Sequence, residues 1–339
     1  MLFYGHLTSS GTAMRVVVTG GSGYVGSAAV RALSDAGHSI VIYDNLSTGH
    51  PKLSRGFELI RGDIGDRDRV LSCLRDADAV MHFAASAYVE ESVVNPRKYF
   101  HNNVESALIL LDAVLQSNVR LFIFSSSCAI YGVPQSLPIV ESAPKDPINP
   151  YGATKLFIEH VLSAYSLAHG LRYVALRYFN AAGAHPSGEI GEIHNPETHL
   201  IPLALRAALN LGSPLTVFGN QLPTPDGTCV RDFIHVSDLA DAHLRALKYL
   251  AEGGSSLALN LGTGKGTSIA ELLRVIEEIS GRKVPHHIVD PRPGDPPILF
   301  ADSSKAREVL GWQPAFGIRE VIQSALHWEE NLQSFLSAP

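Results

Sequence analysis

Two side chains that can move a proton, Tyr151 and Lys155, stand four residues apart in the segment Tyr-Gly-Ala-Thr-Lys. On a helix, residues four apart lie on one face, so the Lys155 ammonium can stabilise a phenolate on Tyr151. A tyrosine with such a partner can act as a base at neutral pH, although its ordinary pKa is near ~10. The same spacing is common on solvated helix faces, so its meaning depends on the rest of the chain.

A run of three serines supplies further polar groups upstream of that pair. Ser125, Ser126 and Ser127 end an apolar stretch that is typical of a buried strand. Strand ends in open parallel sheets face the ligand crevice, where a hydroxyl of this run can hydrogen-bond a substrate oxygen and share its proton. We therefore predict that these serines, Tyr151 and Lys155 form the catalytic group.

A glycine-rich turn near the start of the chain indicates a nucleotide. It follows an apolar, β-branched run that reads as a buried parallel strand, and its glycines are Gly20, Gly23 and Gly26. Gly20 permits a tight turn, Gly23 lets backbone approach a pyrophosphate, and Gly26 lets the next helix pack closely on the strand. The pyrophosphate would lie on the N–H groups of Tyr24 and Val25 at the helix start. The alternative is a turn that serves packing alone.

Residues after the next predicted strands favour NAD as that nucleotide. Asp44 ends the second strand, where a carboxylate accepts hydrogen bonds from the adenosine ribose and repels the 2′-phosphate of NADP. No Arg or Lys occupies positions 45–48. Asp63 can accept a hydrogen bond from the adenine amino group, and Ile64 can cover the ring. Small residues in Phe83-Ala84-Ala85, after the fourth strand, let backbone lie against the cofactor.

Repeated βα units must position these groups. Short apolar runs alternate with amphipathic segments over residues 15–177, which predicts a parallel sheet covered on both faces. The fold class is therefore α/β, with a Rossmann-like doubly wound sheet. The predicted strands are residues 15–19, 39–43, 57–61, 79–83, 121–125 and 173–176, and the predicted helices are 24–36, 66–74, 96–116 and 151–169.

The pattern becomes less regular after residue 177. Residues 181–198 are rich in glycine, proline and histidine, and this connection is too long for a plain turn, so we expect it to be functional. We expect a dinucleotide-binding domain over 14–180, joined by 236–262, and a smaller C-terminal α/β lobe over 181–235 and 263–339. Further predicted elements are helices at 199–211, 236–250, 268–280, 303–310 and 317–331 (the last two short) and strands at 215–218 and 257–261.

Composition limits the partners and the compartment. The chain has 339 residues and a formal net charge of −6, which suggests no nucleic-acid partner. It has no apolar run of about 18 residues, so we predict no membrane span. Residues 1–13 lack the features of a signal peptide, and we expect them to be an extension ahead of the fold. The three cysteines lack metal-ligand spacing, which predicts a reducing cytoplasm, no disulfide framework and no metal site.

The motifs together resemble those of the extended short-chain dehydrogenase/reductases, and most closely the UDP-glucose 4-epimerases. The resemblance extends over residues 14–328. It is carried by VTGGSGYVG at 18–26, YDNL at 43–46, FSSSCAIYG at 124–132, NPYGATK at 149–155, LRYFNAAGA at 176–184, PTPDGTCVRDFIHV at 223–236 and NLGTG at 260–264.

This resemblance implies an epimerisation that uses NAD without consuming it. Tyr151 takes the proton of the sugar 4′-hydroxyl, Ser127 hydrogen-bonds the same oxygen, and Lys155 binds the nicotinamide ribose and lowers the pKa of Tyr151. Hydride leaves C4′ for the cofactor, the 4-keto sugar turns about its bond to the diphosphate, and hydride returns to its other face. The positions then expected against NAD are Gly20, Gly23, Tyr24, Val25, Gly26, Asp44, Asn45, Asp63, Ile64, Phe83, Ala84, Ala85, Asn102, Ser125, Tyr151, Lys155 and Tyr178.

The second lobe would hold a UDP-sugar. Arg231 and Arg292 match positions that clamp the diphosphate, a task for which the planar guanidinium fork is suited. Asp295 matches a ligand of the nucleotide ribose, and Phe218 lies in the uridine pocket of the family. The implied substrate-binding residues are Ser127, Tyr151, Asn180, His199, Leu200, Thr216, Phe218, Arg231, Arg292, Asp295 and Leu299.

Four positions are compared with their counterparts in relatives and refine the expectation. Ala87 stands where some epimerases carry a phosphate-binding lysine, which leaves that role to backbone at the glycine turn. Cys128 and Ala129 replace the Asp-Glu pair of related 4,6-dehydratases, which argues against dehydration. Leu299 matches a gate near the sugar, and its bulk favours UDP-glucose and UDP-galactose over N-acetylated sugars. The alternatives are a 4-epimerase that acts on UDP-pentoses and one that acts on UDP-N-acetylhexosamines.

Two other classes of function compete with an isomerase. A nucleotide-sugar dehydrogenase would release reduced cofactor, and a decarboxylase would need an arginine for a C6 carboxylate, which we do not find reliably placed. An NAD-sensing module on an inactive scaffold would be favoured by loss of Ser127, Tyr151 or Lys155, and all three are present. By analogy with the family, we expect a homodimer formed through the helices predicted at 96–116 and 151–169.

Overall fold

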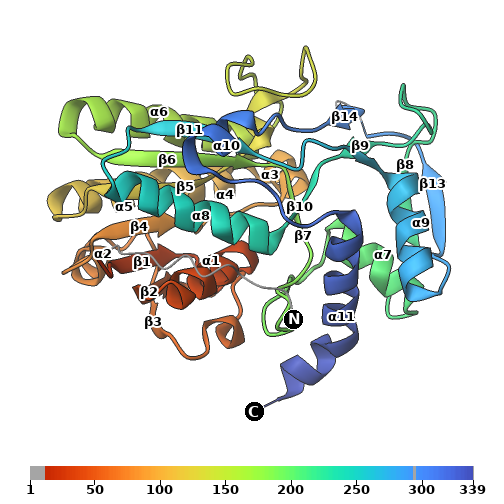
Figure 1. The fold of residues 1–339 in the computed structure, drawn as a ribbon, viewed down its shortest axis with the longest axis horizontal. Helices are drawn as coiled ribbons and strands as arrows, with labels where there is room; N and C mark the ends of the chain where they lie inside the picture. The colour runs from red at the N-terminus through yellow and green to blue at the C-terminus, as the bar shows by residue number, and fades with distance from the viewer. Residues whose placement is uncertain (1–11, 293–294, 339) are drawn as a thin grey trace.

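A seven-stranded parallel sheet organises the molecule, with a smaller lobe beside it (Figure 1). The computed structural model describes residues 12–292 and 295–338, so all but the last two positions of the expected N-terminal extension, residues 1–13, lie outside it. The strand order is β11-β6-β5-β4-β1-β2-β3. These strands are β1 Arg15–Thr19, β2 Ser39–Asp44, β3 Glu58–Arg61, β4 Ala79–His82, β5 Leu121–Ser127, β6 Arg172–Tyr178 and β11 Leu257–Leu261.

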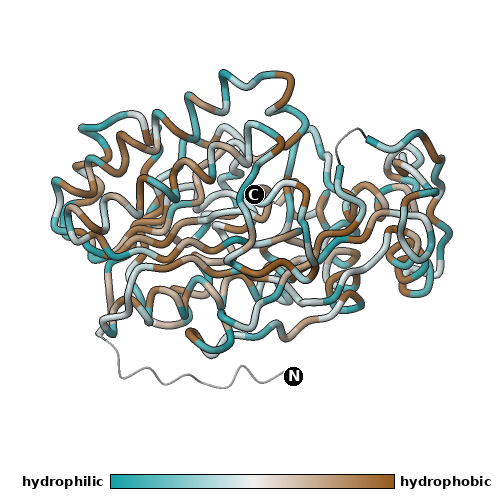
Figure 2. Tube along the Cα trace, turned by 90° about the horizontal axis from the view of Figure 1, so that it is seen from above, coloured by the Kyte–Doolittle hydropathy of each residue, from teal (hydrophilic) through white to brown (hydrophobic). Residues whose placement is uncertain are grey.

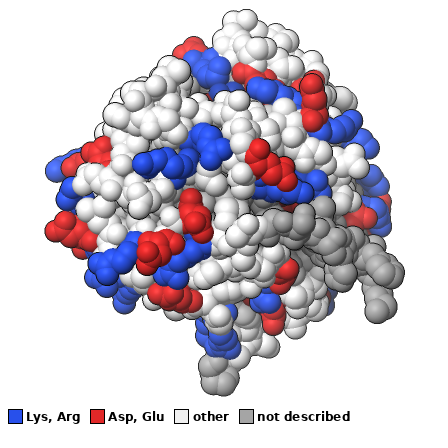
Figure 3. Space-filling view, turned by 60° about the vertical axis from the view of Figure 1, so that its left-hand side comes forward, with Lys and Arg blue, Asp and Glu red and all other residues white. Residues whose placement is uncertain are grey.

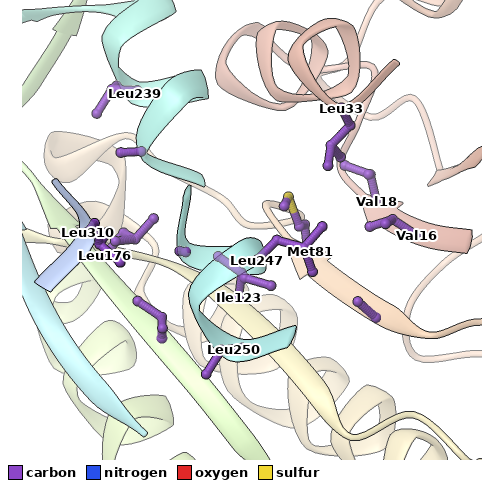
Figure 4. Packing of buried hydrophobic residues seen from close by; sticks show 14 of the residues in the cluster. Val16, Val18, Leu33, Met81, Ile123, Leu176, Leu239, Leu247, Leu250 and Leu310 are labelled. Carbon is purple, nitrogen blue, oxygen red and sulfur yellow. The ribbon is translucent and has the colours of Figure 1, made fainter. Parts of the chain in front are cut away.

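Alternate residues along each strand pack on opposite faces of the sheet. Val16 and Val18 belong to one buried cluster, with helices α1 (Tyr24–Asp35), α8 (Val236–Ala251) and α10 (Ser304–Leu310). Val17 belongs to the cluster on the other face, with α2 (Arg67–Cys73), α5 (Ser106–Gln116) and α6 (Pro150–His169). Figure 4 shows the first cluster, with Leu247 of α8 over Met81 and Ile123. Burial on both faces explains the hydrophobic strand layer of Figure 2.

The strand order reverses between β1 and β4, which places the ligand crevice beyond the carboxyl ends of these two strands. Both strands end beside the glycine turn, since the N–H groups of Phe83 and Ala84 donate to Thr19 O at 2.8 and 3.1 Å. The doubly wound α/β fold predicted from the sequence is confirmed, and the candidate catalytic strand β5 lies next to β4 in the same sheet.

The helix predicted at residues 96–116 is interrupted. It consists of α4 (Pro96–Phe100), a π-helical turn (His101–Glu105) and α5. The π turn is only five residues long and lies between two α-helical segments, so the sequence predicts one continuous helix. Such turns are frequent at functional sites. The prediction of a short last helix was also wrong, since α11 runs over the 20 residues Ile318–Ser337.

The smaller lobe has its own core beside the sheet. Helices α7 (Leu200–Ala208), α9 (Ile269–Ser280) and α11 pack around the strand pair β8 (Leu215–Phe218) and β13 (His286–Val289). Ser268 is the N-cap of α9, and its hydroxyl accepts a hydrogen bond from Glu271 N at 3.0 Å. The remaining elements are α3 Val89–Val94, β7 Asn180–Ala182, β9 Val230–Arg231, β10 Phe233–His235, β12 Thr267–Ser268, β14 Ile298–Leu299 and 3₁₀ turns at Pro51–Ser54 and Cys128–Tyr131.

Charged side chains of both signs are interspersed over the face drawn in Figure 3. Within the described part of the chain, no helix combines the length and the apolar character needed to cross a membrane.

Candidate active site

Backbone packing at the glycine turn leaves no room for side chains. Gly20 has a φ of +74°, and a Cβ there would lie 2.5 Å from Ala84 N. A Cβ on Gly26 would collide with Gly20 O, so α1 packs directly on the turn. A Cβ on Gly23 would lie 3.3 Å from Gly20 O, a tight contact. The turn therefore forms a cradle of bare backbone at the ligand crevice.

The N-terminus of α1 can receive an anion. Gly23 is its N-cap and supplies no side-chain cap, so the first N–H groups of the helix, at Tyr24 and Val25, have no intrahelical partner. The Tyr24 side chain points elsewhere, since its hydroxyl donates to Gly183 O in the connector between the two lobes. Asp44 braces the turn, because its carboxylate accepts from Ser22 N at 3.0 Å and from Leu46 N at 2.8 Å.

A cavity of about 310 Å³ lies at the position expected for the adenine. Asp63 and Asn102 line it, and Asp63 also accepts from Asn45 Nδ2 at 2.9 Å. Ile64 is buried in the core cluster on one face of the sheet, and its chain neighbours Asp63 and Gly65 line the cavity. Asn103 has a supporting role, since its side chain bonds both Ser86 N and Ser86 O, at 2.8 and 2.9 Å.

The three predicted catalytic residues meet where β5 and α6 approach each other. Ser127 ends β5, and it hydrogen-bonds the hydroxyl of Tyr151 at the start of α6. Lys155, one turn later on the buried face of α6, has its Nζ 5.7 Å from the centroid of the Tyr151 ring. Asn149 accepts from Gly152 N at 2.8 Å and caps the helix, which fixes the direction in which Tyr151 projects.

Burial shifts the pKa values of this group. Desolvation raises the pKa of Tyr151 well above its ordinary value, Tyr178 adds to the rise, and the hydrogen bond with Ser127 opposes it. Desolvation lowers the pKa of Lys155 to about 7. Its Nζ donates to Ser125 O at 2.8 Å, and the Ser125 hydroxyl bonds the hydroxyl of Tyr178. A titratable lysine beside a tyrosine is a setting for proton transfer.

A buried ion pair behind this site was not found from the sequence. Glu159, on α6 one turn after Lys155, pairs with Arg177 of β6 through bonds of 2.9 and 2.5 Å. Glu159 also accepts from the Ser126 hydroxyl at 2.6 Å, and Arg177 donates to the Tyr131 hydroxyl at 2.9 Å. The pair therefore fixes α6 to β5 and β6 at the level of the catalytic residues. The one signal was a glutamate on the buried face of a helix.

Residues expected at the nucleotide end come together in two pairs. Arg231 pairs with Asp295 at 2.7 Å. The Arg292 guanidinium lies 3.8 Å from the centroid of the Phe218 ring, and it also pairs with Glu90 at 2.5 Å. Stacked on a ring, a guanidinium keeps its in-plane N–H groups for phosphate oxygens.

The other expected substrate residues lie around the crevice. Asn180 is exposed at the start of β7, and His199 is the N-cap of α7, directly before Leu200. Thr216 is on β8 and bonds His287 Nε2 at 3.0 Å. Leu299, on β14, packs with Cys128 against the cluster of Ile130, Tyr131, Ile139, Phe179 and Ala301, next to the strand end that carries Ser127.

Comparison with known families decides the class of this site. A sequence model of the NAD dependent epimerase/dehydratase family matches residues 16–262, which include the glycine turn and all three catalytic candidates. The chain belongs to this family. Membership agrees with the order of motifs along the chain, and it accounts for β11, which adds a further parallel strand to the sheet after the first substrate-lobe segment.

Several epimerases of the family are similar along nearly the whole chain. A UDP-glucose 4-epimerase from Azospirillum brasilense is 50% identical over 323 residues, which are 94% of this chain and 93% of that protein. The structure of UDP-glucose 4-epimerase from Brucella ovis in complex with NAD has a TM-score of 0.91 and 50% identity, over 94% of this chain and 99% of that one. The Bifidobacterium longum enzyme, in complex with NAD+ and UDP, has a TM-score of 0.90 and 35% identity, over 95% and 99%.

The residues present fit the NAD of an epimerase/dehydratase. The cradle at Gly20 and Gly26 admits only bare backbone, which a pyrophosphate needs, and Asp44 lies beside it with a carboxylate suited to ribose hydroxyls. Phe83 and Ala84 face the glycine turn, and the hydrogen bonds from their N–H groups to Thr19 O hold them there. Ala85 continues that segment, and Tyr178 and Ser125 close the end towards Tyr151.

Proposed function

We propose that this protein is a UDP-glucose 4-epimerase, which interconverts UDP-glucose and UDP-galactose through a transient 4-keto sugar. The observation that carries the proposal is the meeting of Ser127, Tyr151 and Lys155 at the crevice that the glycine turn opens. The family and the similar epimerases support it.

The chain's own residues divide the work of the reaction. When bound, NAD supplies a reversible acceptor for the hydride of C4′. Tyr151 removes and returns the proton of the 4′-hydroxyl, and Ser127 hydrogen-bonds the same oxygen and orients it. Lys155 lowers the pKa of Tyr151 against the desolvation that raises it, and it holds the nicotinamide ribose. The other cofactor contacts are those expected from the sequence, including Ile64, whose neighbours Asp63 and Gly65 line the adenine cavity.

The second lobe holds the UDP portion. Arg231 and Arg292 bind the diphosphate, Asp295 binds the uridine ribose, and Phe218 and Thr216 line the uracil side. Asn180, His199 and Leu200 border the diphosphate. Leu299 limits the space beside the sugar because it packs against the segment that follows Ser127. These roles favour hexoses without an N-acetyl group.

Three broader features belong to the same proposal. The dinucleotide-binding domain is residues 14–180 with 236–262, and the nucleotide-sugar domain is 181–235 with 263–339. We infer a homodimer through α4, α5 and α6, which expose Phe100, Phe157 and Leu167 by 47%, 46% and 88%. We infer a cytoplasmic location, with which the three free cysteines agree.

The test is turnover by purified full-length protein. We expect UDP-galactose to yield UDP-glucose, measured by separation of the nucleotide sugars. Parallel reactions with UDP-N-acetylgalactosamine and UDP-arabinose should be slower. Lack of turnover on UDP-galactose, with NAD also supplied, would refute the proposal, and faster turnover of a parallel substrate would move it to that sugar class.

A further inference from the structure

The connector between β7 and α7 brings together four side chains, and the proposed epimerase reaction gives a role to His199 alone among them. These are Glu192, His194, Glu197 and His199, and one ligand atom from each lies within 4.8 Å of every other. His194 Nδ1 is 2.9 Å from Glu192 Oε1 and 3.7 Å from Glu197 Oε1. His199 Nδ1 is 3.6 Å from Glu197 Oε1 and closer still to Glu192 Oε1. Donor atoms at about 2.1 Å from a tetrahedral Zn²⁺ are ~3.4 Å apart, so the Glu197 spacings are close to an edge of a coordination shell, and His194 and His199 would each move away from Glu192 to admit an ion.

Two atoms of the cluster lack hydrogen-bond partners although they are buried. Glu197 Oε2 has none, on a side chain that is 2% exposed. His194 Nδ1 has none either, despite the carboxylate oxygen 2.9 Å away, because the geometry between them is not that of a hydrogen bond. His199 Nδ1 hydrogen-bonds Glu192 Oε1, and Glu197 Oε1 accepts from the N–H groups of Thr198 and His199. Buried polar atoms normally have partners, so the two atoms left unpaired beside these bonds indicate a missing ligand.

The charges at this place can accommodate a cation. Glu192 and Glu197 are both buried, with side chains 7% and 2% exposed, and Glu329 of α11 shares Arg206 with Glu197. Arg206 is the arginine that reaches them, and its guanidinium is committed to Glu329 at 2.8 and 3.1 Å. Its distance to Glu197 Oε2 is 3.8 Å, beyond a hydrogen bond. Arg206 and the two histidines thus face three carboxylates, and a divalent ion held by neutral imidazoles would supply the same charge as two protonated histidines.

We propose that Glu192, His194, Glu197 and His199 bind one divalent transition-metal ion, with two imidazole nitrogens and two carboxylate oxygens as ligands. This donor set suits Zn²⁺ and is unlike the oxygen-only sets that Mg²⁺ and Ca²⁺ prefer. The absence of cysteine ligands hid the site from the sequence, which predicted no metal.

The ion would fix the connector at the point where it enters the substrate lobe. His199 is the N-cap of α7, and Trp328 of α11 donates to Glu192 O at 2.9 Å. The Tyr88 ring packs on the imidazoles of His194 and His199, at centroid distances of 5.7 and 6.1 Å, and shields one side. None of the four ligands transfers a proton in the proposed reaction. The ion therefore positions Leu200 and its neighbours for the nucleotide and takes no part in the redox step.

The experiment measures metal content and thermal stability of the tag-free full-length chain. The protein is stripped with a chelator, reloaded with Zn²⁺, freed of excess metal and analysed by mass spectrometry for zinc. We expect about one zinc per chain and a higher Tm than in the stripped protein. Co²⁺ in its place should give the intense visible absorption of a four-coordinate site.

Two variants and a matched control assign the site. His194→Gln and Glu197→Gln should each lower retained zinc at least tenfold and abolish the rise in Tm. His101→Gln removes an exposed histidine–glutamate pair of 2.6 Å elsewhere and should retain zinc as the parent does. Less than a tenth of an equivalent of zinc in the parent, with an unchanged Tm, would overturn the proposal in favour of a metal-free histidine–glutamate cluster. Zinc that persists in both variants would overturn it too. Neither result depends on epimerase turnover.

Discussion

Lys155 lies one helical turn after Tyr151 on α6, with its Nζ 5.7 Å from the centroid of the tyrosine ring and 2.8 Å from Ser125 O. The lysine is thus held between the strand that ends in Ser127 and the hydroxyl that must ionise. Burial opposes ionisation of Tyr151, so the nearby cation is needed to offset it.

Tyr151→Phe removes the proton acceptor and leaves the helix intact. We expect turnover to fall by about 10³-fold or more, because general acid–base catalysis contributes on that order. Bound NAD, released by denaturation and quantified, should stay as in the parent. The control is Tyr165→Phe on the same helix, whose hydroxyl bonds Asp112 far from the site. Turnover of Tyr151→Phe near that of the control would reject Tyr151 as the base.

Gly26→Ala tests the cradle. The added methyl group would collide with Gly20 O, which pushes α1 away from the turn, so we expect the NAD content of the purified protein to fall at least tenfold. Gly37→Ala is the control, because it places alanine at a φ of +85° but meets no atom within 4 Å. That variant should lose some stability and keep its NAD. Normal NAD content in Gly26→Ala would show that the turn does not bind the cofactor as described.

Glu159→Gln leaves the buried Arg177 without its counter-charge. We expect the free energy of unfolding to fall by about 3–5 kcal/mol, as for other buried pairs with one partner removed. The control is Glu278→Gln, which removes an exposed partner of Arg274 and Arg319 and should change stability little. Denaturant titration measures both. Equal effects of the two substitutions would mean that the Glu159–Arg177 pair does not fix α6 to the sheet.

His82 should make the fold sensitive to acid. Burial, with a smaller contribution from Lys155, lowers its pKa to about 3, and its Nδ1 bonds the Thr19 hydroxyl at 2.7 Å. Between pH 6.5 and 3 the unfolded chain binds a proton at this residue that the native state does not. Stability therefore falls with falling pH, by about 1.4 kcal/mol per pH unit for this one proton.

His82→Asn removes that titrating group. The slope of unfolding free energy against pH should then decrease by about one proton over the same range, while His160→Asn, at an exposed position on α6, should leave it unchanged. An unaltered slope in His82→Asn would contradict the assignment.

The features that the sequence predicted correctly are those that local pattern encodes. Apolar runs gave the strands of the sheet, and glycine spacing gave the turn at Gly20, because both depend on neighbouring residues alone. The Glu159–Arg177 pair joins a helix and a strand through tertiary packing, and no periodicity marks it. The cluster at Glu192 requires a folded connector without regular structure, so its members cannot be paired from spacing.

The central claim is that one resident NAD takes hydride from C4′ and returns it to the same carbon. The direct measurement uses UDP-galactose carrying deuterium at C4′, full-length protein and no added cofactor. We expect UDP-glucose that retains the deuterium at C4′, as read by mass spectrometry and proton NMR, with no reduced cofactor accumulating in solution. Product whose C4′ deuterium has exchanged with solvent, or conversion that consumes added NAD in proportion, would contradict the account.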